Sequence, residues 1–231
     1  PVALKTVHPR DATHELASER FKREIYLARK VTHPNVCRIY DVGYHGRQDG
    51  SSVIYLTMEL LAGETLSQRI HRQGTLSAAE SLPIARQMMA ALAAAHAAGV
   101  IHRDFKSENV FLVPAAEGTR VVVTDFGVAR GVEYDQFAAR VTVVDAAVGT
   151  PAYMAPEQIE GGAITAAIDQ YALGVVLFEM VTGDLPFAGD TPLATAVKRL
   201  TSAPPSPEEL VPGLDPLWIA VIRRCLARYP A

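Results

Sequence analysis

The chain has 231 residues, of which 49% are hydrophobic and 20% are charged, and its formal net charge is -3. Such a chain can bury a substantial core, and its interspersed charges exclude a basic surface that would recruit nucleic acid or anionic lipid. Cys37 and Cys225 stand far apart with no metal-ligand spacing, which argues against a disulfide framework and fits a reducing compartment. We expect a cytoplasmic globular chain, or the cytoplasmic part of a larger membrane-anchored protein, with both thiols as buried fillers.

The first sixty residues are typical of a small β-rich unit with one helix. Val2–Val7 is a short β-type run, and Ser18–Val31 has apolar residues at helical steps of three and four. Val36–Gly43 and Val53–Glu59 are β-rich runs on either side of a polar loop that contains the turn dipeptide Asp49-Gly50. We predict that these two runs pair as antiparallel strands.

After Leu60–Gly63 the sequence becomes typical of helices. Ser77 with Glu80 three residues later has the spacing of a capping box, and the helix it opens is predicted to end at Gly99. The longest apolar stretch, Ile84–Ile101, is interrupted by polar side chains and rich in alanine, so it indicates a buried helix rather than a membrane span. We place the boundary between a small lobe, residues 1–61, and a large lobe, residues 62–231, at this change.

Three further segments of the large lobe have clear patterns. Ile168–Val181 is apolar nearly all round, which predicts a helix buried at the centre of the lobe. Thr201–Pro212 carries four prolines and is predicted to be a loop, and Leu217–Leu226 is predicted to be an amphipathic helix.

The polar residues that indicate chemistry lie in Ile101–Asn109 and in Asp125-Phe126-Gly127. Asp104 can act as a base toward a hydroxyl, and Lys106 can neutralise charge on a transferred phosphoryl group. Asn109 and Asp125 offer the hard oxygen ligands that Mg²⁺ requires. The plainer alternatives are a solvated turn of mixed charges and two residues that cap turns through their own side chains.

These motifs resemble the catalytic loop and the magnesium-binding loop of the protein kinase family, and Lys106 resembles the serine/threonine-specific branch. The alanine-rich style is similar to that of bacterial serine/threonine kinases of the eukaryotic-like type. The resemblance implies an α+β, two-lobed kinase fold, ATP and Mg²⁺ in the cleft, and transfer of the γ-phosphoryl group to Ser or Thr hydroxyls of protein substrates. It implies no oligomeric state.

The resemblance also assigns residues of the small lobe. Lys5, in Val2–Lys5, is similar to the strand lysine that holds the α- and β-phosphates, and Glu24 is similar to its helix partner. In an unrelated protein Lys5 would be a solvated strand end and Glu24 would pair with Arg20. Glu24 shares the apolar face of its helix, where an unpaired carboxylate is expensive to desolvate, so an inward lysine partner is the better interpretation.

Met58-Glu59-Leu60 lies where kinases have the hinge that offers backbone hydrogen bonds to an adenine edge, with Met58 in the gatekeeper position. An ordinary strand end is the alternative. Glu64 is predicted to reach a ribose hydroxyl, with a surface role as the alternative.

Gly149–Glu157 resembles the peptide-docking and Ala-Pro-Glu segment that ends a kinase activation loop. Thr150 is similar to the threonine that bonds to the base and the lysine of serine/threonine kinases. Asp169 is similar to the aspartate that holds the backbone of the catalytic loop.

Thr142 is the only aliphatic hydroxyl between Val128 and Val148. We expect its phosphorylation to order the activation loop, because Arg103 and Arg130 can pair with a phosphate there. A threonine without a regulatory role is the alternative.

The chain departs from the family pattern in three places. It starts at the strand lysine, without the Gly-rich loop that covers the phosphates, and it stops before the last helices and the arginine that usually pairs with the glutamate at Glu157. We therefore expect a kinase fold truncated at both ends, as in a segment excised from a longer protein. Ser107 replaces a proline often found in the catalytic loop, and we expect little effect because this position does not react.

Two other functions stay open. A pseudokinase, which binds or scaffolds without turnover, is disfavoured because every reacting side chain is retained. A small-molecule phosphotransferase of the same fold is disfavoured by the peptide-docking segment Gly149–Glu157.

Overall fold

The computed structural model of the chain describes residues 1–7, 25–46, 52–126 and 151–229. Four residues that the sequence assigns to the site lie outside these ranges, namely Glu24, Arg130, Thr142 and Thr150.

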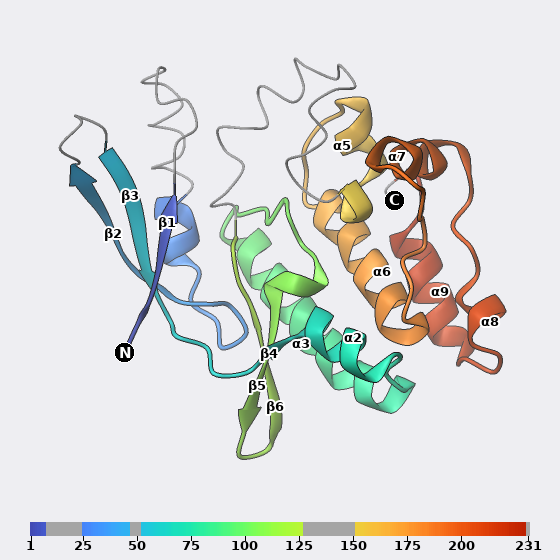
Figure 1. The fold of residues 1–231 in the computed structure, drawn as a ribbon, viewed down its shortest axis with the longest axis horizontal. Helices are drawn as coiled ribbons and strands as arrows, with labels where there is room; N and C mark the ends of the chain where they lie inside the picture. Colours follow the sequence, from blue (N-terminus) through green and yellow to red (C-terminus); the bar gives the residue numbers. More distant parts are fainter. Residues whose placement is uncertain (8–24, 47–51, 127–150, 230–231) are drawn as a thin grey trace.

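A three-stranded antiparallel sheet forms the small lobe (Figure 1). Strand β3 (Ser52–Met58) lies between β1 (Ala3–Val7) and β2 (Ile39–Gly46). The predicted strands and the antiparallel pairing are confirmed, although β2 was predicted over Val36–Gly43 and is displaced along the chain. Residues 25–30 are helical, which agrees with the described part of the predicted helix. Ile25 on that helix is buried against Ile54 and Leu56 of β3, so one face of the sheet is covered.

The residues just before β2 join the small lobe to the large one. Val36, predicted to belong to a strand of the small sheet, instead forms a parallel bridge with Val123. The Cys37 N–H donates to the Val123 carbonyl at 2.8 Å, and the Val123 N–H donates to the Asn35 carbonyl at 2.8 Å. These hydrogen bonds use the backbone groups that a longer β2 would need, which explains why β2 begins at Ile39.

The large lobe begins with a second sheet and two helices. The sheet has the order β4 (Glu64–Thr65), β5 (Val110–Ala115) and β6 (Gly118–Val123). Helices α2 (Leu66–Gln73) and α3 (Ala78–Ala97) lie beside it. The predicted capping box at Ser77 and Glu80 is confirmed, and Gly99 follows α3 with a φ of 73°, in the left-handed region that favours glycine.

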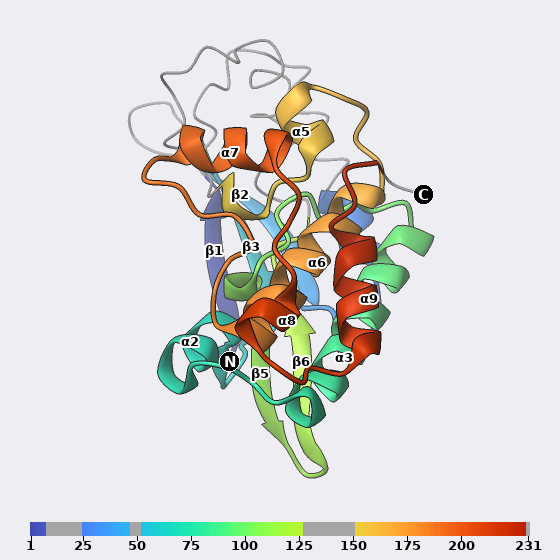
Figure 2. The same ribbon diagram turned by 90° about the vertical axis from the view of Figure 1, so that its right-hand side faces the viewer.

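Helix α6 (Ala167–Thr182) runs through the centre of the large lobe, and α9 (Pro216–Cys225) lies beside it (Figure 2). Nearly every side chain of α6 is buried, as its apolar sequence predicts. Gly174 permits the close approach of α9, because a Cβ there would lie 2.6 Å from the Cβ of Cys225. Cys225 is half-buried rather than buried as predicted, whereas Cys37 is buried; both are free thiols.

The remaining elements are short. They are η1 (Ser107–Asn109), η2 (Pro151–Tyr153), α5 (Pro156–Glu160), α7 (Pro192–Thr201) and α8 (Pro207–Leu210). The prediction of a loop over Thr201–Pro212 was wrong in part. Pro207 stands at the first position of α8, where its missing N–H has no helical partner to lose and its fixed φ suits a helix. Within the described ranges, no helix has the length and apolar content needed to cross a membrane.

Candidate active site

The backbone of the predicted catalytic loop is attached to the first turn of α6. The carboxylate of Asp169 accepts hydrogen bonds from the backbone N–H groups of His102, at 2.7 Å, and of Arg103, at 2.9 Å. Arg103 has a φ of 67°, a conformation that is rare for residues other than glycine and is often found at functional sites. The expected contact between Asp169 and this loop is therefore confirmed, and it stabilises an otherwise unfavourable backbone.

His96 is a partner of Asp169 that the sequence did not reveal. Its Nε2 lies 2.7 Å from Oδ2 of Asp169. The two residues are far apart in sequence, and a histidine inside an alanine-rich helix carries no signal of such a pairing. The contact adds α3 to the set of elements that hold the loop.

His102 lies at the centre of the loop as a fully buried, neutral imidazole. Its Nε2 is 2.8 Å from the Thr124 carbonyl, and its Nδ1 accepts from the Asp104 N–H at 3.3 Å. One ring nitrogen thus donates and the other accepts, as only the neutral form can. Burial is the main cause that lowers the pKa of His102 below its ordinary value. The ring also packs against Phe105 and Phe126, so one buried side chain links the loop to the Asp-Phe-Gly segment.

Asp104 and Lys106, the proposed base and cation, lie together. The Nζ of Lys106 is 3.2 Å from Oδ2 of Asp104, and each side chain is about a quarter exposed or less. The Nδ2 of Asn109 donates to the Asp104 carbonyl at 2.8 Å, which fixes the side-chain amide and leaves Oδ1 as its acceptor.

The β5–β6 hairpin brings Asn109 next to Asp125. Val110 at the start of β5 is paired with Val123 at the end of β6, so Asn109 and Thr124 flank the same end of the hairpin. The Thr124 N–H donates to the Asn109 carbonyl at 2.9 Å. Asp125 follows with a φ of 66°. Strand pairing, rather than contact between the side chains, thus sets the two proposed magnesium ligands side by side.

Lys5 reaches this group from the small lobe. Its Nζ lies 2.7 Å from Oδ1 of Asp125, with both side chains about one third exposed. The sequence led us to expect Glu24 as the partner of Lys5, and Glu24 lies outside the described residues. The pair with Asp125 was not predicted, because the sequence cannot show how closely the two lobes approach.

The residues present fit Mg²⁺ shared with a nucleotide. Asn109 Oδ1 and the Asp125 carboxylate are hard oxygen donors, and Lys5 occupies only one of the two carboxylate oxygens. Across the described ranges, no group of three or more His, Cys, Asp and Glu side chains could hold a metal. The donor set therefore suits an ion that completes its coordination with phosphate oxygens and water rather than with protein alone.

At the predicted hinge, Glu59 is held by an arginine from the large lobe. Arg120 of β6 forms a forked pair with the Glu59 carboxylate, at 2.8 and 3.1 Å, and its Nε donates to the Pro34 carbonyl at 2.9 Å. A single arginine in a strand gives no signal of this role in the sequence. Leu60 is exposed.

Met58, the proposed gatekeeper, lines a small pocket beside Asp125 and Phe126. Cys37 lines the same pocket. Burial, reinforced by the charges of Glu59 and Asp125, raises the pKa of the Cys37 thiol to about 12, so this thiol is protonated at neutral pH.

Glu64 has a different environment from the one expected. Its carboxylate accepts from Arg69 at 2.5 Å and from Arg72 at 3.0 Å. The hydrogen bond from Arg69 is the main cause that lowers the pKa of Glu64, and the one from Arg72 adds to it. Two arginines compete with a ribose hydroxyl for this carboxylate, and the ribose contact stays a prediction.

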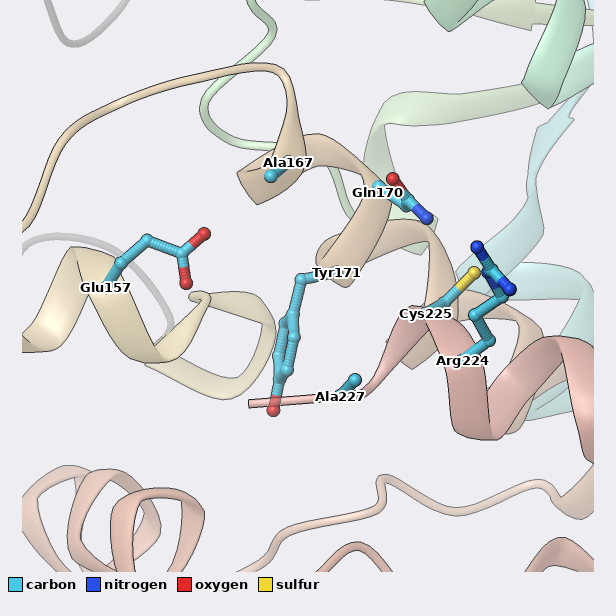
Figure 3. A pocket seen from close by; sticks show the side chains of 7 residues that line it. All are labelled: Glu157, Ala167, Gln170, Tyr171, Arg224, Cys225 and Ala227. Atoms are coloured by element: carbon cyan, nitrogen blue, oxygen red, sulfur yellow. The ribbon is translucent and has the colours of Figure 1, made fainter. Parts of the chain in front are cut away.

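A second pocket lies away from the catalytic loop, between α5, α6 and α9 (Figure 3). Figure 3 shows Glu157 and Arg224 on opposite sides of the pocket, with Tyr171 between them. In the described part of the chain, Glu157 has no basic partner within salt-bridge distance.

The two-lobed fold and the residues between its lobes define a protein kinase domain. Residues 1–228 match the protein kinase domain family, and the chain belongs to that family.

Two similar curated proteins are bacterial kinases. The chain is 36% identical to the serine/threonine-protein kinase pkn3 of Myxococcus xanthus, over 100% of this chain and 42% of the relative. It is 37% identical to the serine/threonine-protein kinase PknA of Mycobacterium tuberculosis, over 100% of this chain and 51% of the relative. The chain thus spans about half the length, or less, of these curated relatives.

Among solved structures, the crystal structure of the Mycobacterium tuberculosis PknI kinase domain is similar, with a TM-score of 0.73 and 28% sequence identity. The similarity covers 99% of this chain and 78% of that one. The expected family and fold class are confirmed, and the chain represents part of that fold.

Proposed function

We propose that this chain is the core of a serine/threonine protein kinase that transfers the γ-phosphoryl group of ATP to a Ser or Thr hydroxyl of a protein. The observation that carries the proposal is a chain of contacts between the two lobes: Lys5 pairs with Asp125, and Lys106 pairs with Asp104. Asn109 joins the two pairs, because its side chain bonds to the Asp104 carbonyl and its own carbonyl accepts from Thr124, next to Asp125. Phosphoryl transfer depends mostly on positioning and on charge stabilisation, and these residue types supply both.

Each side chain has one task in the proposed reaction. Asp104 orients the acceptor hydroxyl and accepts its proton, and Lys106, 3.2 Å from Asp104, neutralises charge on the transferred group. Lys5 holds the α- and β-phosphates once it leaves Asp125. Asn109 Oδ1 and the Asp125 carboxylate would hold the metal, which supplies charge neutralisation at the phosphate oxygens.

The hinge and the activation segment complete the proposal. The backbone of Glu59 and Leu60 faces the adenine edge, with Met58 behind it, and Glu64 bonds to the ribose. Glu24 takes Lys5 as its partner in the active state. Thr150 bonds to Asp104 and Lys106 during peptide docking, and a phosphate on Thr142 pairs with Arg103 and Arg130. The substrates are proteins, and the compartment is the cytoplasm.

A transfer assay on the full-length protein tests this function. We expect labelled phosphate to move from γ-labelled ATP to casein in the presence of Mg²⁺, and Asp104→Asn to lower kcat by about 100-fold or more. Asp41→Asn is the matched control, because Asp41 is a 73% exposed carboxylate on β2 whose ion-pair partner within the described ranges is the exposed Arg29. It should keep the wild-type rate.

Three results would contradict the proposal. No transfer to any acceptor, with nucleotide binding intact, would indicate a pseudokinase. Phosphorylation of an aminoglycoside or choline in preference to casein would indicate a small-molecule phosphotransferase. Equal rates for wild type and Asp104→Asn would remove Asp104 from the reaction.

A further inference from the structure

Ser107 lies inside the catalytic loop, one residue after Lys106 and two before Asn109, and its side chain is fully buried. Its hydroxyl donates to Oε1 of Glu179 at 3.1 Å and lies 3.0 Å from the Tyr153 hydroxyl. Tyr153 in turn donates to Oε2 of Glu179 at 2.8 Å. Serine, tyrosine and glutamate therefore form a closed ring of three contacts, which we call the Ser107 ring.

The ring joins three separate parts of the molecule. Ser107 belongs to the catalytic loop, Tyr153 to the end of the activation segment, and Glu179 to the central helix α6. Tyr153 is buried, and Glu179 is half-buried. A carboxylate removed from water needs donors, and the two hydroxyls supply them. Burial raises the pKa values of both Glu179 and Tyr153 above their ordinary ranges, which agrees with a site poor in water.

The ring lies at the opposite end of the loop from the contact with Asp169. Asp169 and Glu179 are ten residues apart on α6, which is about 15 Å along a helix that rises about 1.5 Å per residue. Asp169 holds the backbone of His102 and Arg103, before the reacting residues. Glu179 holds Ser107, after Asp104 and Lys106. The loop that carries these residues is thus attached to one rigid helix at two points.

We propose that Ser107 is a positioning residue for phosphoryl transfer: its hydroxyl, which bonds to Glu179 and lies against the Tyr153 hydroxyl, fixes the Lys106–Asn109 turn on α6 so that Lys106 and Asn109 face the reacting phosphate. This inference rests on the proposed function. It differs from our expectation from the sequence, that a serine here has little effect. Ser107 touches no substrate, so its role is expressed through Lys106 and Asn109.

Ser107→Ala tests the inference, with Ser81→Ala as the matched control. Ser81 is also fully buried in the large lobe, and among the described residues its hydroxyl bonds to the Leu76 carbonyl alone. We expect Ser107→Ala to lower kcat for casein by about 10-fold to 100-fold, the effect of a small misplacement of reacting groups, while the KM for ATP stays within about twofold. Ser81→Ala should keep kcat and KM, whatever it does to Tm.

Two further variants, Glu179→Gln and the double variant that combines Ser107→Ala with Glu179→Gln, test whether Ser107 acts through the ring. Because both changes break the same ring, the double variant should lose no more kcat than the worse single variant. Tyr153→Phe opens the ring from its other side and should also lower kcat with little change in KM for ATP. It serves in place of Ser107→Ala if that variant does not fold.

Hydrogen exchange gives a readout that does not need turnover. In Ser107→Ala the backbone amides of residues 106–109 should exchange at least about 10-fold faster than in wild type, while those of α6 stay protected. A kcat within twofold of wild type, or equal losses in Ser107→Ala and Ser81→Ala, would overturn the inference. If the wild-type protein transfers no phosphate, that result contradicts the proposed function, and unchanged exchange at residues 106–109 would then overturn the role of Ser107.

Discussion

At the scale of single residues, the site depends on side chains whose protonation state is set by burial. His102 shows this best, because it is fully buried, bonds to Thr124 and Asp104, and has a lowered pKa. The unfolded chain therefore binds a proton more readily than the folded one. Folded-state stability due to His102 is complete above the unfolded pKa of about 6.5 and is lost as pH falls from there toward the lower pKa of the folded protein.

Urea unfolding between pH 7 and pH 5 measures this effect. We expect the free energy of unfolding to carry a contribution from His102 that falls by up to about 1.4 kcal/mol per pH unit over this window. His102→Gln keeps a donor for the Thr124 carbonyl and cannot titrate, so it should be less stable but less dependent on pH.

Glu179 contributes with the opposite sign. Its raised pKa means that the folded state holds its proton more tightly, so its contribution to stability is lost as pH rises from its unfolded value of about 4.5 through its folded pKa. The contribution of Glu179 cancels when His102→Gln is compared with wild type, because Glu179 is present in both proteins. Identical pH dependence in the two proteins would show that His102 does not titrate on unfolding.

The residue scale is also where the sequence was most informative. Asp104, Lys106, Asn109 and Asp125 could be predicted as site residues because residue type and spacing alone define the chemistry they offer. His96 and Arg120 could not, because each acts through a partner that is distant in sequence: Asp169 and Glu59 respectively.

At the scale of elements, strand β6 contacts the proposed hinge and leads into the proposed metal-binding segment. Its last residue, Val123, lies two positions before Asp125. Arg120 on the same strand forms two parallel hydrogen bonds to the Glu59 carboxylate and a third to the Pro34 carbonyl. Forked arginine–carboxylate pairs are stronger and more directional than single contacts. We infer that this pair fixes the hinge against the large lobe.

Arg120→Lys tests the two-bond pair between Arg120 and Glu59, since lysine keeps the charge but cannot make two parallel hydrogen bonds. We expect a loss of about 1 to 2 kcal/mol in the free energy of unfolding by urea, together with a higher KM for ATP. Arg29→Lys is the control, because Arg29 and Asp41 form a long, exposed contact of 3.4 Å, and such pairs contribute about 0 to 1 kcal/mol. Equal effects of the two substitutions would contradict a special role for Arg120.

Helices and strands were predicted correctly where the signals in their own sequence are strong. The helix at Ser77, the apolar helix α6 and the antiparallel strands were predicted because capping residues, apolar pattern and turn residues are local. The start of β2 was misplaced because Val36 pairs with Val123, a distant strand. Helix α8 was missed because the three other prolines of this segment favoured a loop and outweighed the helix signal of the proline at its first position.

At the scale of the whole molecule, the two lobes are linked across the site by the Lys5–Asp125 pair, at 2.7 Å. In the proposed function, a nucleotide phosphate would attract Lys5 and Mg²⁺ would attract Asp125. Binding of the two together would then replace an attraction between the lobes with a shared ligand. We expect nucleotide to stabilise the protein much more with Mg²⁺ than without it.

Thermal unfolding of the full-length protein with ATP, in Mg²⁺ or in EDTA, measures the difference. At about 100 times the Kd, bound ligand stabilises the folded state by about 2.7 kcal/mol, which is about 5 to 10 °C in Tm for a domain of this size. Asp125→Asn should abolish most of the Mg²⁺-dependent increase. Asp41→Asn should leave it intact, and a full increase in Asp125→Asn would exclude Asp125 as a metal ligand.

The amino-acid sequence by itself determined the family of this protein and the residue types that its proposed site offers, because these residues lie in short segments whose residue types and spacing are read directly. Only the tertiary structure decided which residues contact one another. Asp125 pairs with Lys5, Glu59 pairs with Arg120, and Ser107 contacts Glu179 and Tyr153. The physical reason is that each of these contacts joins residues far apart along the chain. Their distance is set by how strands and helices pack, and no local pattern of residues encodes it.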